Sequence, residues 1–425
     1  MADDPIDWRK QDMSATRSLT LNACRSCGET RLDPILDLGT TPLADRLLRR
    51  DQLEEPEPAF PLEVVFCPRC TLVQIRETVA PELLFAAEYP YFSSFSTYLL
   101  EHSRRNVEEL IRMRRLGPKS FVVELASNDG YLLRNYVAAG ILVLGIDPVA
   151  GVARAAEKAG VPTLVEFFTR DLAGRIAAKG QQADVLHANN VLAHVADTNG
   201  FVAGIHTLLK ENGVAVIEAP YVRDLVDHCE FDTIYHEHLC YFSVTSVDHL
   251  FRRHGLYLNE VRRLPIHGGS LRLYVERREK VGESVSTLLA EESRLGLDRA
   301  DYYLGFSARV EQLKKSLVTL LRDLKAQGKR IAAYGAAAKG ATLINFVGIG
   351  PELLEFVVDR NVHKQGMFMP GQKIPIYPSE RILQEKPDYV LLFPWNLESE
   401  ILQQESAFRE AGGRFIIPVP MPRIV

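Results

Sequence analysis

The chain has 425 residues, of which 46% are hydrophobic and 25% are charged, and its formal net charge is −5 at pH 7. This length exceeds one ordinary hydrophobic core, so we expect two or three domains. The slightly acidic balance offers no broad basic surface and argues against nucleic acid as a partner. The polar start "MADDPIDWRK" is unlike a signal peptide, and no apolar run approaches the ~20 residues needed to cross a bilayer, so we predict a soluble cytoplasmic protein with no membrane partner.

Two Cys-x-x-Cys pairs, "CRSC" and "CPRC", stand near the start of the chain. Two such pairs can supply four thiolates to one tetrahedral Zn²⁺ ion. Disulfides are the alternative, and they fit poorly with a cytoplasmic chain. A closed four-sulfur site leaves no position for substrate, so we predict a structural zinc that folds a small N-terminal domain within residues 1–85. The predicted ligands are Cys24, Cys27, Cys67 and Cys70. Cys229 and Cys240 form no such pair, and we interpret them as packing residues.

Short apolar strands alternate with helical patterns across residues 86–277. "SFVVELASNDGYLLRNYVAAG" and "LVLGIDPVAGVARAAEKAG" each have the order strand, tight turn, helix, and "ADVLHANNVLAHV" and "GVAVIEAPY" add two more strands. This alternation predicts a Rossmann-like parallel sheet covered on both faces. Ligands of such sheets bind at the carboxyl ends of the strands.

The first turn of this sheet, "ELASNDG", lacks the G-x-G-x-x-G pattern of a dinucleotide site. The next strand ends in Asp147, which can accept hydrogen bonds from both ribose hydroxyls of a nucleoside. A nucleoside without a pyrophosphate but with an amino-acid tail suits the site, and we therefore predict S-adenosylmethionine as the cofactor. Asp147 can instead cap a helix that begins at Pro148, and Asn189 and Asn190 can equally be loop-forming residues. The candidate contacts are Glu124, Ala126, Ser127, Asn128, Gly130, Asp147, Asn189 and Asn190.

Residues 278–425 begin with a long helical pattern and continue into a second α/β unit. "RIAAYGAAAKGATLINF" is predicted to be a strand, a loop of small residues and a helix, and the following strand ends at Asp359. Backbone amides at such a helix start attract phosphate, and Lys339 would add positive charge. The alternative is a scaffold domain that has Rossmann-like topology without binding a nucleotide.

A polar run, "FDTIYHEHLCYFS", lies between these two units. Tyr235, His236, Glu237 and His238 stand side by side there, which is unsuited to a core. A metal site made of both histidines and Glu237 is disfavoured, because in an extended segment Glu237 would point away from its neighbours. A polar loop with only a structural role is the other alternative.

Together, the four-cysteine domain, "VELASNDGYLL", "YHEHLCYFS", "HGGSLR" and "AYGAAAKG" resemble the S-adenosylmethionine-dependent C-methyltransferases that make branched deoxysugars. The resemblance covers nearly the whole chain. It implies methylation at C3 of a nucleotide-linked 4-keto-deoxysugar, with the donor in the middle domain and the nucleotide of the sugar in the C-terminal domain. The family's usual first turn is closer to "EIGSNDG", and Ala126 replaces its glycine here with another small residue.

This chemistry gives the polar run a purpose. Removing the C3 proton beside a ketone requires a base and a donor that holds the enolate oxygen. We expect His238 to be the base, since histidine titrates near neutral pH, and Tyr235 to be the donor. Glu237 would orient a histidine or bind a sugar hydroxyl. The resemblance adds catalytic His194 and one of two tyrosines, Tyr89 or Tyr91, and we expect His236, His267 and Lys339 to contact substrate, although His267 can equally be a turn residue.

Two other classes of function remain open. An NAD-dependent nucleotide-sugar oxidoreductase would use the α/β domains but lacks the G-x-G-x-x-G loop. A non-catalytic zinc-containing protein that binds nucleotide-sugars would leave "YHEH" unexplained. The sequence does not distinguish thymidine from guanosine as the attached nucleoside. A chain with three packed domains of its own is expected to be a monomer.

Overall fold

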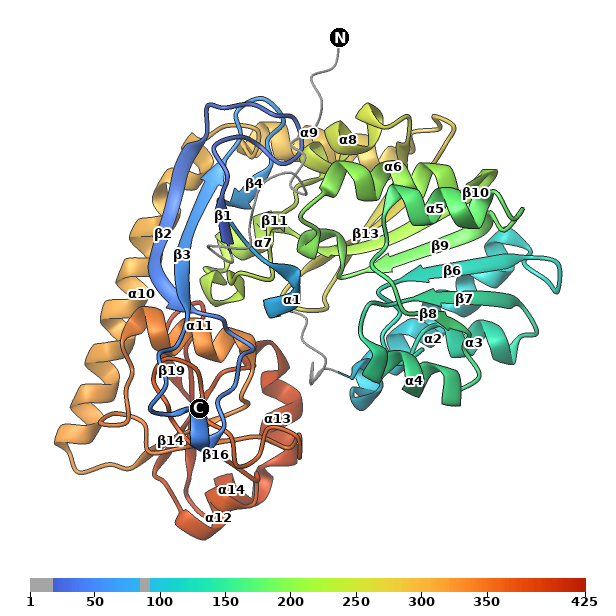
Figure 1. Cartoon of the computed structure of the whole chain (residues 1–425). Coiled ribbons are helices and arrows are strands. Elements are labelled where there is room, and N and C mark those ends of the chain that lie inside the picture. The colour runs from blue at the N-terminus through green and yellow to red at the C-terminus, as the bar shows by residue number, and fades with distance from the viewer. Residues whose placement is uncertain (1–17, 85–91) are drawn as a thin grey trace.

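The computed structural model describes residues 18–84 and 92–425, so Tyr89 and Tyr91 lie outside the described residues. Helices and three principal sheets make up the molecule (Figure 1), which confirms the predicted α/β class with a small N-terminal unit and two Rossmann-like units. Within the described ranges, no helix combines the length and apolar character needed to cross a membrane.

The N-terminal sheet is built around a long antiparallel hairpin, seen at the left of Figure 1. Its strands β2 and β3 are followed by the short strand β4, and the fourth strand, β11, comes from far along the chain. A second, two-stranded sheet pairs β1 with β5. The bounds are β1 Ser18–Thr20, β2 Asp33–Pro42, β3 Ala59–Phe66, β4 Val73–Ile75, β5 Glu77–Val79, α1 Pro81–Leu84 and β11 Cys240–Tyr241.

The middle sheet has seven strands in the order β12-β13-β10-β9-β6-β7-β8. Strands β6 to β10 are parallel, and β13 and β12 add an antiparallel edge. Its strands are β6 Phe121–Leu125, β7 Leu142–Ile146, β8 Thr163–Leu164, β9 Ala183–Asn189, β10 Leu209–Pro220, β12 Tyr257–Leu264 and β13 Ser270–Glu276. Its helices are α2 Thr97–Arg114, α3 Leu133–Ala138, α4 Ala150–Lys158, α5 Arg170–Ala177, α6 Thr198–Leu208, α7 Val222–Asp227 and α8 Val244–Arg253.

The C-terminal sheet has the order β16-β15-β14-β17-β18-β19. Its first five strands are parallel and repeat the spatial order of β8-β7-β6-β9-β10 in the middle sheet, so the chain contains the same Rossmann-like arrangement twice. Its strands are β14 Ile331–Tyr334, β15 Val357–Val358, β16 Ile376–Tyr377, β17 Tyr389–Leu392, β18 Arg414–Ile417 and β19 Arg423–Ile424. Its helices are α11 Ala338–Val347, α12 Arg381–Glu385, α13 Glu398–Gln404 and α14 Ser406–Glu410.

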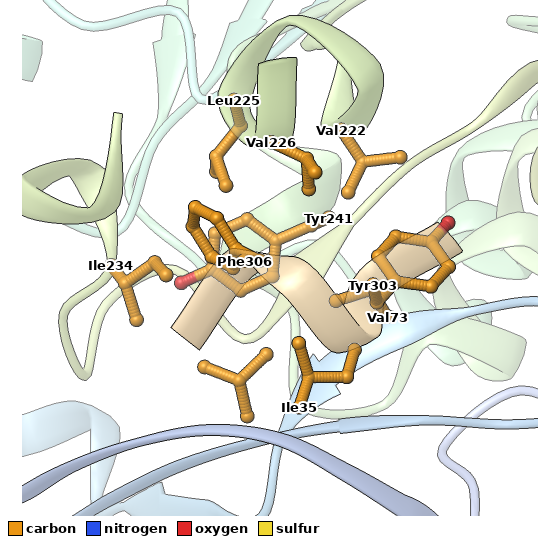
Figure 2. A pocket seen from close by; sticks show the side chains of 10 residues that line it. Ile35, Val73, Val222, Leu225, Val226, Ile234, Tyr241, Tyr303 and Phe306 are labelled. Atoms are coloured by element: carbon orange, nitrogen blue, oxygen red, sulfur yellow. The ribbon is translucent and has the colours of Figure 1, made fainter. Parts of the chain in front are cut away.

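Helix α10 (Asp301–Ala326), which follows α9 (Glu283–Leu295), joins the units through its apolar stripe. Near its start, the Tyr303 ring packs on Phe66 of β3 with 5.1 Å between centroids. One continuous hydrophobic cluster therefore runs from the N-terminal sheet to the C-terminal sheet. Figure 2 shows a small apolar cavity at this junction, lined by Ile35, Val64, Val73, Val222, Leu225, Val226, Ile234, Tyr241, Tyr303 and Phe306. Because its lining is apolar, we assign it to packing.

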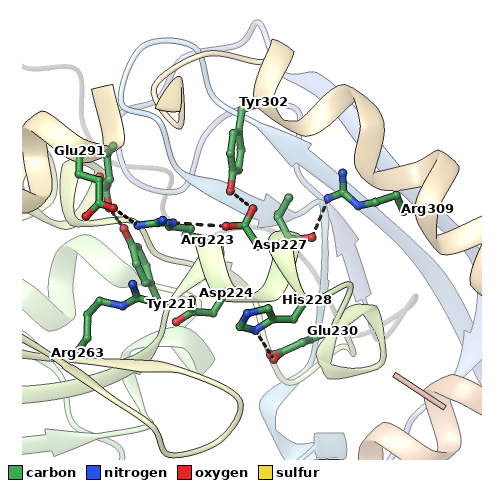
Figure 3. Close-up of polar contacts among 12 residues, drawn as sticks. Tyr221, Arg223, Asp224, Asp227, His228, Glu230, Arg263, Glu291, Tyr302 and Arg309 are labelled. Carbon is green, nitrogen blue, oxygen red and sulfur yellow. Dashed lines mark hydrogen bonds and ion pairs between the residues drawn. The ribbon is translucent and has the colours of Figure 1, made fainter. Parts of the chain in front are cut away.

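A polar network fixes helix α7 against α9 and α10 (Figure 3). Arg223 donates to Glu291 at 2.8 Å, and Asp227 accepts from Tyr302 at 2.5 Å. The neighbouring carboxylate of Glu292 is buried and accepts from the Tyr221 hydroxyl and from the backbone amide of Val244, the first residue of α8. The polar run of the sequence connects α7 to α8, so this network holds both of its ends.

Candidate active site

His238 and Tyr235 lie together in the irregular segment between α7 and β11. Their ring centroids are 4.0 Å apart, and the Tyr235 hydroxyl is 3.0 Å from Nε2 of His238. The other ring nitrogen, Nδ1, is 2.7 Å from the backbone carbonyl of Thr233. A carbonyl can only accept a hydrogen bond, so Nδ1 carries the proton and Nε2 of the neutral ring accepts from Tyr235. This arrangement presents the basic nitrogen toward the Tyr235 hydroxyl.

Three further predicted residues surround this pair. The His194 ring meets the His238 ring edge to face with 4.7 Å between centroids, and its own pKa is lowered to about 4 by burial. Positive charge on His194, Lys339 or His267 lowers the pKa of the His238 ring. The structure therefore brings together His194, Tyr235, His238, His267 and Lys339, which come from the middle and the C-terminal units.

We expect the acid limb of turnover against pH to lie below pH 6.5. Burial lowers the pKa of His238 well below its ordinary value of 6.5, and neighbouring His194 lowers it further. A base with a depressed pKa stays neutral, and so active, as the pH falls to that depressed value, whereas an unperturbed histidine would be half protonated near pH 6.5. A pH profile of kcat checks this, and an acid limb at pH 6.5 or above would contradict it.

Glu237 and His236 point away from this group. Burial raises the pKa of the Glu237 carboxyl well above its ordinary value, and the adjacent carboxyl of Asp45, to which it is hydrogen-bonded, raises it further. Nε2 of His236 lies 3.2 Å from the Phe60 carbonyl and 3.1 Å from the Pro61 carbonyl in β3. Because His236 is also only 1% exposed, its geometry favours a packing role over the substrate contact that we expected.

Two buried acids that the sequence analysis did not single out face Lys339. Burial raises the pKa of Glu230 to about 8 and that of Asp232 to about 6. Asp232 accepts from the indole of Trp395 at 2.7 Å, and Nζ of Lys339 lies 4.4 Å from the centre of that ring. Lys339 also donates to Asn396 at 2.7 Å. Lys339, which we expected to add positive charge near phosphate, thus lies among acidic and aromatic side chains.

The double glycine of "HGGSLR" was a signal for Glu230 and for a further acid, Asp224. Gly268 and Gly269 have φ values of +92° and +137°, which L-residues with side chains rarely adopt. A Cβ atom on Gly268 would lie 2.4 Å from a Glu230 oxygen, and one on Gly269 would lie 2.1 Å from an Asp224 oxygen. The turn that carries His267 therefore needs glycine because carboxylates approach its backbone.

The predicted cofactor residues gather at the carboxyl edge of the middle sheet. Asp147 follows β7, and its two carboxylate oxygens each accept a backbone amide at 2.9 Å, one from Asn128 in the first turn and one from Val149. Ala126 and Asn128 have φ values of +53° and +49°, so the turn is left-handed at two residues that are not glycine. Asn189 ends β9, and Asn190 follows it with a φ of +52°. Asp147 does not cap a helix at Pro148, because α4 begins at Ala150 and its N-cap, Val149, has no side-chain cap hydrogen bond. Its oxygens instead order the turn, and each keeps a second lone pair for a ribose hydroxyl.

The chemistry of this edge fits a cationic nucleoside. Burial raises the pKa of Glu124 well above its ordinary value, and the acidic neighbours Asp147 and Asp129 raise it further. Buried oxygens of Ser127 and Asp129 have no hydrogen-bond partner within the described structure. The sulfonium and ammonium groups of S-adenosylmethionine would offset this excess of buried acid.

The C-terminal unit repeats this contact between an acidic side chain and the first turn of the sheet. Asp359 follows β15, and its two oxygens each accept a backbone amide at 2.7 Å, from Ala336 in the first turn and from Asn361. Asp147 makes the corresponding two contacts in the middle unit. Asp359 thus ends the second strand of its unit in the place where nucleotide-binding folds hold ribose.

The four predicted zinc ligands converge. Their sulfur atoms all lie within 4.8 Å of one another, and the pairs Cys24–Cys70 and Cys27–Cys67 are both 3.5 Å apart. Zn–S bonds of about 2.3 Å in a tetrahedron place sulfurs roughly 3.8 Å apart, so the cluster fits one zinc ion. In residues 18–84 and 92–425 this is the only cluster that could hold a metal ion, and His236, Glu237 and His238 form none.

The two cysteine turns have the same backbone conformation. The amide four residues after the first cysteine, that of Gly28 or Thr71, donates to the carbonyl of Cys24 or Cys67 at 2.9 or 2.8 Å. Both residues have positive φ, +73° at Gly28 and +61° at Thr71. By contrast, Cys229 and Cys240 are buried apart from the cluster, and burial raises the pKa of each thiol to about 11.

Family models match three successive parts of the chain. Residues 24–85 match a model described as "Putative zinc binding domain", residues 98–261 a "Methyltransferase domain", and residues 265–420 a "C-methyltransferase C-terminal domain". The chain is 36% identical to "C-methyltransferase NovU" of Streptomyces niveus over 408 residues, which cover 95% of this chain and 97% of that protein.

Two solved structures that resemble the chain each overlap with less than half of it. A magnesium protoporphyrin IX methyltransferase of Synechocystis with bound SAH is 19% identical, covers 42% of this chain and 83% of its own, and has a TM-score of 0.34. An S-adenosylmethionine-dependent methyltransferase of Clostridium acetobutylicum is 12% identical, covers 43% and 92%, and also has a TM-score of 0.34.

Proposed function

We propose that the substrate is a nucleotide-linked 4-keto-deoxysugar, which is methylated at C3 through an enolate. The premise is that the chain belongs to the S-adenosylmethionine-dependent C-methyltransferase family. The chain uses S-adenosylmethionine and holds a structural zinc ion. The observation that carries the proposal is the His238–Tyr235 pair, a neutral base and a phenol held 3.0 Å apart between the two Rossmann-like units.

Each site residue has a separate role in forming or stabilising the enolate. Nε2 of His238 takes the proton from the carbon next to the ketone, and Thr233 keeps Nδ1 protonated, so the resulting imidazolium keeps both of its N–H donors. The Tyr235 hydroxyl must first turn from Nε2 to the ketone oxygen, which frees the Nε2 lone pair for the proton and lets the hydroxyl donate to the enolate oxygen as it forms. His194 and Lys339 bring further donors to the same place. When bound, S-adenosylmethionine supplies the electrophilic methyl group that the carbanion accepts.

The C-terminal unit offers the nucleotide half of the site. Asp359 would accept from the ribose, and the start of α11 provides backbone amides for phosphate. The Phe92 ring lies over His363 with 6.4 Å between centroids, which suits an aromatic base at this place. Lys339 faces Glu230 and Asp232, so we place it beside the sugar ring rather than on the diphosphate.

The test is methyl transfer itself. The purified protein is incubated with methyl-labelled S-adenosylmethionine and a panel of nucleotide-linked 4-keto-deoxysugars, and the products are analysed by mass spectrometry and NMR. A labelled methyl group on C3 supports the proposal. A methyl group on C5, on the other side of the same ketone, would contradict the position but not the enolate chemistry. Absence of transfer together with bound nicotinamide would favour the oxidoreductase instead.

The two equivalent acids make a matched pair of variants. We expect Asp147→Ala to weaken S-adenosylmethionine binding by roughly 2–4 kcal/mol, because hydrogen bonds to a charged acceptor are lost, and to leave affinity for the sugar nucleotide nearly unchanged. Asp359→Ala should weaken binding of the sugar nucleotide and leave the affinity for S-adenosylmethionine nearly unchanged. Calorimetry with each ligand measures both effects. Unchanged donor affinity in Asp147→Ala would leave Asp147 only its role in ordering the turn.

A further inference from the structure

We infer that the zinc-bound turns position the catalytic base, and that Gln74 is the positioning residue that couples them. The first observation is strand β11, which begins two residues after His238 and completes the N-terminal sheet. Cys240 pairs with Gln74 and Tyr241 pairs with Val73, and the amide of Ile75 donates to the Leu239 carbonyl at 3.1 Å. The segment that carries His238 thus continues directly into an edge strand of the zinc domain.

Gln74 connects this edge to the other cysteine turn. It lies on β4, four residues after Cys70, and is only 1% exposed. Its side-chain oxygen accepts from the backbone amide of Arg25, between Cys24 and Cys27, at 3.0 Å. The Arg25 guanidinium donates to the carbonyl of Ile75 at 3.2 Å. One side chain therefore joins the first cysteine turn to the strand that pairs with the catalytic segment.

Helix α8, which follows β11 in the chain, contacts the same turns. His249 Nδ1 lies 3.3 Å from the Cys70 carbonyl, and Arg253 donates to the Ser26 carbonyl. Leu239 itself donates to the Ala193 carbonyl at 2.8 Å, next to His194. The chain that follows His238 is thus held against the two turns that four thiolates would close around zinc, and Leu239 links it to the residue before His194.

The proposed consequence is a dependence of turnover on the geometry of these turns. A catalytic group displaced by about 1 Å can cost on the order of 10²-fold in rate without changing what it binds. A closed four-thiolate site is rigid, and Gln74 transmits that rigidity to residues 239–241. This inference rests on the proposed role of His238, so its test includes a measurement that needs no substrate.

The first test is substitution of Gln74. Gln74→Met keeps the length of the side chain and removes the acceptor, so we expect kcat to fall about tenfold or more with KM for both substrates within twofold and with one zinc ion per chain retained. Gln74→Glu restores an acceptor beside Arg25 and should recover most of the turnover. Thr78→Val is the matched control, because Thr78 is also buried in this domain but pairs with β1 rather than β11. Wild-type kcat in Gln74→Met would overturn the proposal.

The second test is hydrogen exchange of the whole protein before and after zinc is removed with a chelator. We expect amides of residues 234–243 to lose protection with the metal, while those of residues 414–417 in β18 keep theirs. Protection of residues 234–243 that survives zinc loss would overturn the proposal even if Gln74→Met does not fold. Exchange needs no keto-sugar, so a wrong substrate assignment leaves this result unaffected.

Discussion

His238→Ala is expected to lose on the order of 10²–10⁴ in turnover, the usual scale for a positioned acid–base group. The loss should appear in chemistry and not in folding, because the hydrogen-bond partners of the ring, Thr233 and Tyr235, belong to its own segment. Calorimetry should show that the variant still binds S-adenosylmethionine and the sugar nucleotide.

Deuterium exchange distinguishes the base from a bystander. With the demethylated donor product in place of S-adenosylmethionine, the wild-type protein should exchange the C3 hydrogen of its substrate with D₂O, and His238→Ala should not. Exchange at the wild-type rate in His238→Ala would assign the base to another residue, with His194 as the first candidate.

Tyr235→Phe is the matched variant, since it keeps the ring that stacks on His238 and deletes only the hydroxyl. If Tyr235 donates to the enolate oxygen, turnover should fall by a comparable or somewhat smaller factor, and slow exchange should remain. Complete loss of exchange would instead show that the proton reaches His238 through the tyrosine hydroxyl, a path that the 3.0 Å contact would permit.

Cys67→Ser is expected to release the zinc ion and to destabilise the protein strongly. A structural zinc site contributes on the order of 10 kcal/mol to folding, and an incomplete thiolate shell binds the metal far more weakly. The Cys67 backbone also closes the second turn by accepting from Thr71. The zinc content measured by elemental analysis should fall from one ion per chain toward zero, and Tm should drop clearly.

Cys229→Ala is the control for this change. Cys229 is also buried, but it lies apart from the four ligands, so the variant should keep its zinc. Active wild-type protein that contains no zinc on fresh purification would contradict the assignment.

Sequence reasoning was most successful where local pattern determines structure. The spacing of the two cysteine pairs led to a cluster that the structure contains. The alternation of strand and helix led to two Rossmann-like sheets. In both cases the information lies within a few residues of chain or in a simple repeat.

The sequence was least informative where long-range contacts decide the direction of a side chain. His236 and His238 are two residues apart and were both expected in the site, but β3 carbonyls hold His236 elsewhere. Glu237 meets Asp45, nearly 200 positions away, and Glu230 and Asp232 become relevant only because Lys339 is folded against them. The roles of these side chains depend on how the three units pack, which no local pattern records.

The shared core restricts how this enzyme can be recombined with its relatives. Helix α10 lies just before the C-terminal sheet, yet its residues Tyr303 and Phe306 help to line the cavity beside Ile35 and Val64 of the N-terminal sheet. A chimera joined between β13 and α9 would therefore bring a foreign helix into a hydrophobic interface shaped for the native one. A junction in the short loop after α10, near Gly328, leaves that interface intact. Exchange of the C-terminal unit between relatives should accordingly succeed more often from residue 328 onward than from residue 278.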